Sequence, residues 1–134
     1  MKRGTILFHT KFQFKNGDIG EKLIAILNEP DPAKEPFLIC RTTSQQKGKS
    51  TNPGCQADLS MFYLSANSDF FEKGTWIQLY EIYEVEVHSF LKDHFDGNLK
   101  IMGELKDGTI KSLLKCIAVL QDISPRHRKM ILGK

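Results

Sequence analysis

Hydrophobic and polar residues alternate over short stretches in the first half of the chain, as they do in half-buried β-strands. The alternation predicts strands at residues 5–14, 22–28, 37–43, 61–64 and 75–80, and the last of these could continue to residue 87. Residues 22–28 (KLIAILN) form a compact apolar run, which predicts a central strand buried on both faces. Between the first two strands, Asn16-Gly17 favours a hairpin turn because both residues tolerate positive φ.

The pattern turns helical after residue 87. Residues 87–95 predict a short helix, and residues 99–102 predict an edge strand or a linker. In residues 109–120 apolar side chains recur every three or four positions, which predicts the clearest helix of the chain. Asp107-Gly108-Thr109 supplies a candidate N-cap for it, and Pro125 is expected to end it. Several strands and a closing helix predict an α+β fold, a small and mostly antiparallel barrel or curled sheet covered by helix.

Residues 44–59 (SQQKGKSTNPGCQADL) are a long polar stretch with no apolar period. Loops of this length are uncommon in a small domain, and they tend to be functional or disordered. The stretch also belongs to a wider region, residues 36–57, that has no acidic residue, and residues 124–134 have none either. A segregated basic region suits a polyanion such as nucleic acid, and a solvated surface explains it equally well.

The size and composition of the chain narrow the class of protein. Its 134 residues fit one domain, residues 1–134, around one hydrophobic core. A hydrophobic fraction of 40% and a charged fraction of 26% exclude a disordered or collagen-like chain. No apolar run approaches the ~20 residues that span a membrane, so no membrane partner is expected. The first residues show no signal-peptide pattern, which predicts a cytoplasmic protein.

The cysteines and histidines lack the spacing of a metal site. Cys40, Cys55 and Cys116 form no C-x-x-C pair, and the histidines are equally scattered. We therefore expect no zinc and three reduced thiols, with Cys40 and Cys116 packed in the core. The motifs of phosphate-binding loops, dinucleotide-binding folds and α/β-hydrolases are also absent from the sequence. Any catalysis is expected to use cations and hydroxyls, with no metal and no cofactor.

A block of two strands and a loop resembles the PemK/MazF family of toxin endoribonucleases. Lys22 opens one apolar strand (KLIAILN), and after a connection a second one (FLICRTT) passes into the flexible stretch SQQKG. Residues 71–79 (FEKGTWIQL) are similar to the turn and strand that precede the family's closing elements, and residues 109–120 stand where the family has a helix. In layout the resemblance covers about two-thirds of the chain.

The resemblance implies a fold, an activity and partners. The fold is an SH3-like β-barrel of the CcdB/PemK type with a C-terminal helix. The activity is metal-independent cleavage of single-stranded RNA, in which the ribose 2′-hydroxyl attacks the adjacent phosphate. The implied partners are single-stranded RNA, a second copy of the chain in a homodimer, and a cognate antitoxin protein that blocks the groove.

The resemblance also implies site residues. Lys22 matches the position of the first cation, Arg41 could hold the phosphate, and Thr43 matches a hydroxyl that hydrogen-bonds a phosphate oxygen. His9 is a candidate proton carrier because imidazole titrates near neutrality. Each of the four has a structural alternative, as a solvated lysine, a surface ion pair, a β-branched strand residue or a structural histidine. The candidate RNA-binding residues are Thr42, Ser44, Gln45, Gln46, Lys47, Lys49 and Trp76.

One departure from the family leaves the activity open. The family's Arg-Pro pair, whose arginine is catalytic, is replaced by Lys22-Leu23; lysine keeps the charge but lacks the planar fork that grips a phosphate through two hydrogen bonds. A catalytically silent barrel that binds nucleic acid or a protein is the alternative, and a gyrase-poisoning toxin on a related barrel is a third. The nuclease hypothesis requires Lys22, Arg41 and Thr43 to face one concave, positively charged wall.

Overall fold

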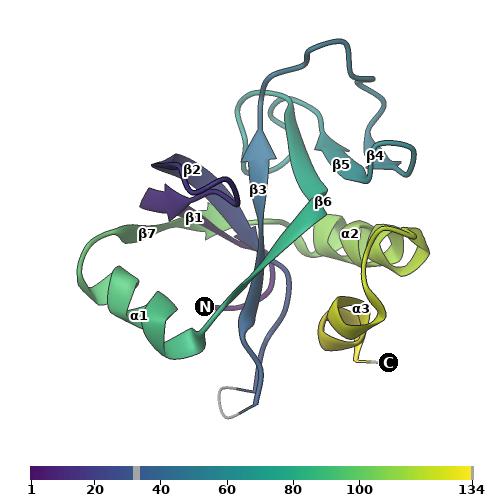
Figure 1. Cartoon of the computed structure of the whole chain (residues 1–134). Helices are drawn as coiled ribbons and strands as arrows, with labels where there is room; N and C mark the ends of the chain where they lie inside the picture. The colour runs from purple at the N-terminus through teal and green to yellow at the C-terminus, as the bar shows by residue number, and fades with distance from the viewer. Residues whose placement is uncertain (32–33, 134) are drawn as a thin grey trace.

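One antiparallel β-sheet surrounded by three helices makes up the computed structural model, which describes residues 1–31 and 34–133 (Figure 1). The strands are β1 (Thr5–Gln13), β2 (Ile19–Ile26), β3 (Phe37–Thr43), β4 (Gly54–Gln56), β5 (Met61–Leu64), β6 (Thr75–Val85) and β7 (Leu99–Glu104). The helices are α1 (Val87–Phe95), α2 (Asp107–Val119) and α3 (Pro125–Leu132). The α+β class predicted from the sequence is therefore confirmed.

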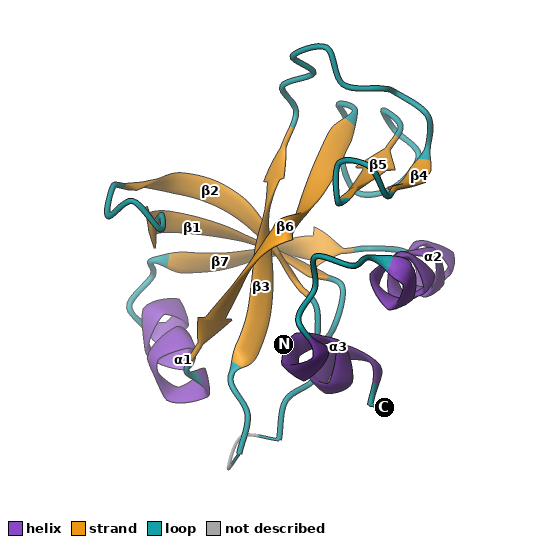
Figure 2. Ribbon diagram, turned by 45° about the vertical axis from the view of Figure 1, so that its right-hand side comes forward, coloured by secondary structure: helices purple, strands orange, loops and turns teal. Residues whose placement is uncertain are grey.

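The strands follow the order β4-β5-β6-β3-β2-β1-β7, and every pair of neighbours is antiparallel. β4 and β7 are the two edges, and no pairing joins them within residues 1–31 and 34–133. The antiparallel sheet is confirmed, but its closure into a barrel is not. Figure 2 shows β3 and β6 crossing the group of β1, β2 and β7 at a steep angle, so the sheet is strongly twisted.

The strand predictions hold best where turn residues mark the ends. In the β1–β2 hairpin the Phe14 amide donates to the Asp18 carbonyl at 2.8 Å, and Gly17 takes a φ of 94°, which favours glycine. β3 and β5 have the predicted bounds. β2 begins at Ile19, earlier than predicted, and residues 54–56 of the predicted polar loop form the edge strand β4.

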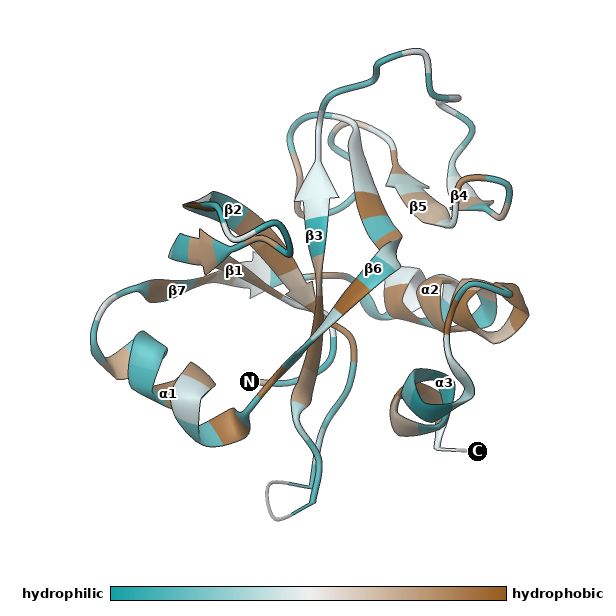
Figure 3. Cartoon of the chain, in the orientation of Figure 1, coloured by the Kyte–Doolittle hydropathy of each residue, from teal (hydrophilic) through white to brown (hydrophobic). Residues whose placement is uncertain are grey.

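The two faces of the sheet pack into different hydrophobic clusters, because side chains alternate along a strand. Ile6 lies opposite Ala25, and this row packs in the cluster beneath α2 and α3. The next row, Leu7 opposite Ile24, packs on the other face with Phe90 of α1. Figure 3 shows hydrophobic residues along the centres of these strands, whereas the loop after β3 is largely hydrophilic.

Two of the helices were predicted, and only α2 differs from its predicted ends. α1 has the predicted bounds, and the stretch 99–102 is the start of the edge strand β7. α2 begins at Asp107, so Lys106, which has extended backbone angles, occupies the N-cap in place of the predicted Asp107–Thr109 stretch. No helix of the described part of the chain is both long and apolar enough to cross a membrane.

The expectation for Pro125 is wrong, because this residue begins a third helix. Its missing amide needs no partner in the first turn of a helix. Ser124 caps the helix by accepting a hydrogen bond from the His127 amide at 3.1 Å, and Gly133 ends it in a left-handed conformation, φ 75°. A proline that follows a helix often ends it, but Pro125 occupies the first position of α3 and so begins a helix.

The basic residues of α3 mainly hold this helix against the rest of the protein. Arg126 donates two hydrogen bonds to Glu84 of β6, at 3.0 and 3.2 Å, and a ring nitrogen of His127 lies 2.7 Å from the same carboxylate. Arg128 hydrogen-bonds the carbonyls of Leu120 and Ile123. Arg126 and Arg128 are therefore engaged within the protein, which weakens the prediction that residues 124–134 bind a polyanion. Residue 134 lies outside the described residues.

Replacing Glu84 with glutamine is expected to lower stability at neutral pH but have little effect near pH 2. Hydrogen bonds from Arg126 and His127 lower the pKa of Glu84 from 4.5 to about 2, so folding favours its ionised form. This contribution is present above pH 4.5 and is lost as the pH falls toward 2. The melting temperatures of wild type and Glu84→Gln should therefore converge on the acidic side. The exposed Glu86 supplies a control, Glu86→Gln, for which a pH-dependent difference of the same size would contradict the prediction.

Two of the three cysteines form a disulfide, so the expectation of three reduced thiols is wrong. Cys55 of β4 is bonded to Cys116 of α2, which lies 61 positions later in the sequence. Cys40 and Cys116 are buried, as predicted. Cys40 remains a free thiol, and burial raises its pKa to about 12. The bond joins an edge strand to a helix distant in sequence, a pairing that wide spacing alone does not reveal.

Candidate functional site

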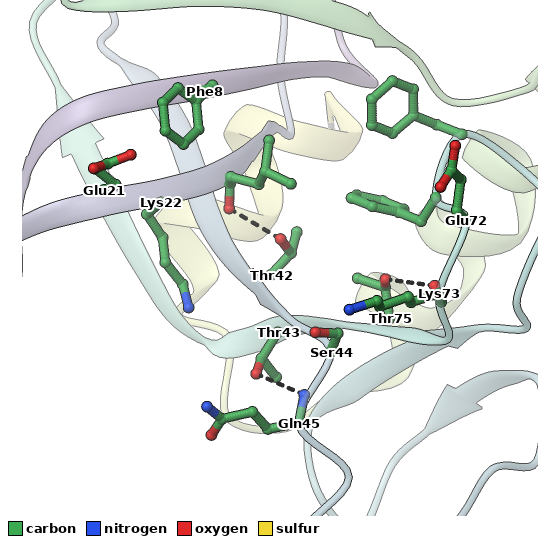
Figure 4. A pocket seen from close by; sticks show the side chains of 13 residues that line it. Phe8, Glu21, Lys22, Thr42, Thr43, Ser44, Gln45, Glu72, Lys73 and Thr75 are labelled. Carbon is green, nitrogen blue, oxygen red and sulfur yellow. Dashed lines mark hydrogen bonds between the residues drawn. The ribbon is translucent and has the colours of Figure 1, made fainter.

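A groove of about 630 Å³ lies where β2 and β3 separate. Their pairing stops at Ile24 and Arg41, although β2 begins earlier, at Ile19, and β3 continues to Thr43. The two strand ends therefore form a fork, which we call the β2–β3 fork. Its residues line one side of the groove, and the segment that precedes β6 lines the other (Figure 4).

Lys22 is the half-buried cation of the β2–β3 fork. Among the described residues no carboxylate lies within 4.0 Å of its Nζ. Burial lowers the pKa of Lys22, and the positive charge of Arg41 lowers it further. In Figure 4 its side chain extends along the groove toward Thr43 and Gln45. A partly buried ammonium without an acidic partner is unfavourable for folding, and it is well suited to bind an anion.

The threonines at the end of β3 have different roles. Thr42 is buried, and its hydroxyl donates to the Leu23 carbonyl at 3.0 Å, which bridges the two strands at the base of the fork. Thr43 is half-buried, and its Oγ1 accepts a hydrogen bond from the Gln45 amide at 3.2 Å. The hydroxyl hydrogen of Thr43 and that of the exposed Ser44 remain available to a ligand in the groove.

The segment before β6 forms the opposite wall, and two contacts fix it. The carboxylate of Asp69 accepts hydrogen bonds from the Lys106 amide at the start of α2, at 3.1 and 3.2 Å. Gly74 lies so close to the Tyr63 hydroxyl that a Cβ there would collide with it. Lys73 is held between these two positions, and in Figure 4 its ammonium extends toward the β3 end of the groove.

The other end of the groove is apolar. Phe8 of β1, Leu23 of β2, Phe70 and Phe71 line it, and the Phe70 and Phe71 rings meet edge to face with centroids 5.0 Å apart. Aromatic faces are surfaces on which nucleobases stack. The groove thus places two cations and several hydroxyls beside an aromatic surface, within one concave space.

Arg41 lies next to this groove rather than in its lining. It shares a sheet face with Lys22 and Thr43, because Arg41 lies opposite Ile24 and side chains alternate along a strand. Its guanidinium is 3.5 Å from Glu81 and stacks on the Phe14 ring at 5.4 Å. Within the part of the chain that the structure describes, its buried Nε has no hydrogen-bond partner. Arg41 therefore acts on Lys22 through its charge, while one nitrogen of its guanidinium is paired with Glu81.

His9 lies in a separate depression of about 370 Å³ beneath α1. Its Nδ1 accepts a hydrogen bond from the Lys11 amide at 3.1 Å, and its Nε2 is 3.5 Å from Asp93. Burial lowers the pKa of His9, and Asp93 partly offsets that effect. Both ring nitrogens therefore have partners, and the structure does not bring His9 into the lining of the groove with Lys22.

The remaining predicted RNA-binding residues belong to the loop after β3 or lie beneath it. Trp76 is only 2% exposed; Lys49 stands over its ring at 4.8 Å, and its indole N–H donates to the Ser50 carbonyl at 3.2 Å. Gln46 and Lys47 are exposed on the loop, outside the groove. Of the predicted residues, the structure brings together Lys22, Thr42, Thr43, Ser44 and Gln45.

Sequence reasoning missed more than half of the groove. The missed residues are Phe8, Glu21, Leu23, Phe70, Phe71, Glu72, Lys73 and Thr75. A signal existed for Lys73, since it precedes a glycine inside the stretch FEKGTWIQL, from which only Trp76 was taken as a site residue. No local signal marks Phe8, which reaches the groove because β1 pairs with β2 and places Phe8 opposite Leu23.

The described residues contain no group of three histidine, cysteine, aspartate or glutamate side chains that could hold a metal ion. The polar lining of the groove consists of two lysines, two glutamates, hydroxyls and an amide. The lysines, hydroxyls and amide are groups that contact phosphates, and the two carboxylates offset the charge of the lysines. No protein-family model matches the chain, and no curated protein matches it either.

Proposed function

We propose that the chain is an endonuclease that cleaves single-stranded RNA without a metal ion, with the groove at the β2–β3 fork as its active site. The observation that supports this most is Lys22: a partly buried ammonium, without a carboxylate partner among the described residues, in a groove with Thr43, Ser44 and a second lysine. The roles of toxin, antitoxin partner and homodimer, the closed barrel and the cytoplasmic location rest on the sequence alone and stay predictions.

The proposed reaction forms one bond to phosphorus and breaks one. The 2′-oxygen forms a bond to phosphorus while the bond from phosphorus to the 5′-oxygen breaks, which leaves a cyclic phosphate and a free 5′-hydroxyl. Negative charge grows on the non-bridging oxygens, where Lys22 and Lys73 supply positive charge and Thr43 supplies a hydroxyl donor. Such donors act best in a partly dehydrated site, which the apolar end of the groove provides.

Two protons must also move. A carboxylate at the groove, Glu21 or Glu72, accepts the proton of the 2′-hydroxyl. Lys22 donates a proton to the departing 5′-oxygen, and the lowering of its pKa by burial and Arg41 makes this donation easier. Arg41 is a positioning residue in this scheme, because its charge tunes Lys22 without contact with the RNA.

A binding protein without catalysis is the second candidate function, and one observation favours it. The guanidinium of Arg41, the group best able to grip a phosphate, is already engaged by Glu81 and Phe14. Lysine alone offers no planar pair of donors. In this case the same groove would hold RNA, with a base against Phe8 and Phe70, and leave the chain intact.

Incubation of the purified protein with a long single-stranded RNA in EDTA tests the proposal. We expect discrete cuts whose 5′ fragments end in a cyclic phosphate. An RNA of the same sequence with a 2′-deoxyribose at a mapped cut should stay intact at that position, because the attacking hydroxyl is missing. Saturable binding without cuts would establish the second function instead, and neither cuts nor binding would overturn both.

A further inference from the structure

The Cys55–Cys116 disulfide lies at the far end of the loop that begins at the groove. Cys55 is exposed on the three-residue edge strand β4, whereas Cys116 is 2% exposed within α2. The loop of residues 44–53 starts with the groove residues Ser44 and Gln45 and ends where β4 begins. β4 is held by the short ladder to β5 and by this one covalent bond to the helix.

A series of contacts connects the disulfide to the groove. Gln56, next to Cys55, donates from its side-chain amide to the Ser50 and Asn52 carbonyls at 2.8 and 3.1 Å. The Ser50 carbonyl also accepts the indole N–H of Trp76. Lys49 lies over the Trp76 ring, and its ammonium donates to the carbonyl of Gln45, a residue of the groove, at 2.5 Å. The position of β4 therefore decides whether residues 44–53 can stay packed on the sheet.

We propose that this disulfide is a site of thiol–disulfide exchange, with Cys55 as the sulfur that an external thiol attacks, and that opening it releases residues 44–53 from the sheet. The exposed position of Cys55 admits a small thiol such as glutathione or the dithiol of a reducing protein, while Cys116 is shielded by α2. In the cytoplasm, the location predicted from the sequence, disulfides are commonly of this transient, responsive kind.

The exchange balances in two steps. A thiolate attacks Cys55 Sγ, a mixed disulfide forms there, and Cys116 leaves as a thiolate that takes up a proton. A second thiol then attacks the mixed disulfide, which yields the oxidised external disulfide and the Cys55 thiol. Two electrons pass from the external thiols to the protein disulfide. Cys40 takes no part, because it is fully buried and its thiol is not ionised near neutral pH.

Mass spectrometry and limited proteolysis of the folded protein test the proposal together. In glutathione buffers of rising reducing strength, acid quenching and alkylation should trap glutathione on Cys55 and later show two new free thiols. Trypsin should cleave after Lys47 and Lys49 at least about ten-fold faster once the bond is open, because the loop opens locally more often. Opening the bond also lowers global stability, so cleavage after Lys15, in the β1–β2 hairpin, serves as the comparison site. Cleavage after Lys47 and Lys49 should clearly precede it.

The variant Cys55→Ser reproduces the open form without reductant. It should show the fast cleavage after Lys47 and Lys49 both with and without glutathione. The proposal is overturned if glutathione is trapped on Cys116, if no exchange occurs unless denaturant is added, or if loop cleavage is equal in the oxidised and reduced protein. Cleavage after Lys15 as fast as cleavage after Lys47 and Lys49 in the open form would show only a global effect and would also overturn it. None of these readouts depends on RNA cleavage.

Discussion

Replacing Lys22 with methionine is expected to reduce RNA cleavage by roughly 100- to 1,000-fold, the usual effect of removing one preorganised charge donor from an active site. Methionine preserves the unbranched stem of lysine and removes only the ammonium. Lys73→Met should have a smaller effect, since Lys73 is exposed and its charge is better screened by solvent. Single-turnover rates on one RNA, with the enzyme in excess, measure both.

The same variant should be more stable than the wild type. Burial and Arg41 lower the pKa of Lys22, so the folded state disfavours its charged form. This unfavourable contribution is present at neutral pH and disappears as the pH rises through the lowered pKa toward the ordinary value of 10.5. The melting temperature of Lys22→Met should therefore exceed that of wild type by a small amount, on the order of 1–3 °C at neutral pH, and the gap should close in alkali.

A loss of activity with a gain of stability separates a functional lysine from a structural one. Lys11 offers the matched control, because it is an exposed strand lysine outside the groove. Lys11→Met should change neither the cleavage rate nor the melting temperature. If Lys22→Met cleaved RNA at the wild-type rate, Lys22 would be only a strand-end residue, and the nuclease proposal would lose its main support.

Local patterns were sufficient for much of the fold. The strands 37–43 and 61–64 and the helix 87–95 appear with the predicted bounds, because each is a short apolar or periodic stretch between turn residues. Pro125 shows where such patterns are ambiguous: the same residue stops one helix or starts the next, and only the capping contact of Ser124 decides. β4 has no apolar period and exists because β5 lies beside it.

The site was predictable on one side only. Lys22 and Thr43 lie near each other in a strand–loop–strand motif, so their approach follows from the pairing of two neighbouring strands. Lys73 reaches the groove because Asp69 is anchored at α2 and Gly74 packs on Tyr63. The residues next to Lys73 in the sequence do not indicate these contacts. Arg41 lies on the same sheet face as Lys22, but its partner Glu81 belongs to a third strand, β6, which the strand–loop–strand motif does not include.

Cys55→Ser is expected to lower the free energy of unfolding by roughly 2–4 kcal/mol, because the disulfide closes a long loop and so restricts the unfolded chain. The 61 positions between the cysteines place the effect toward the upper end of that range. Cys55 is exposed, so serine there removes the cross-link without leaving a cavity, whereas Cys116→Ala adds a buried void and should cost more. Urea unfolding with and without reductant measures this: reductant should destabilise the wild type and leave Cys55→Ser unchanged. Equal stabilities of wild type and Cys55→Ser under oxidising conditions would contradict the cross-link.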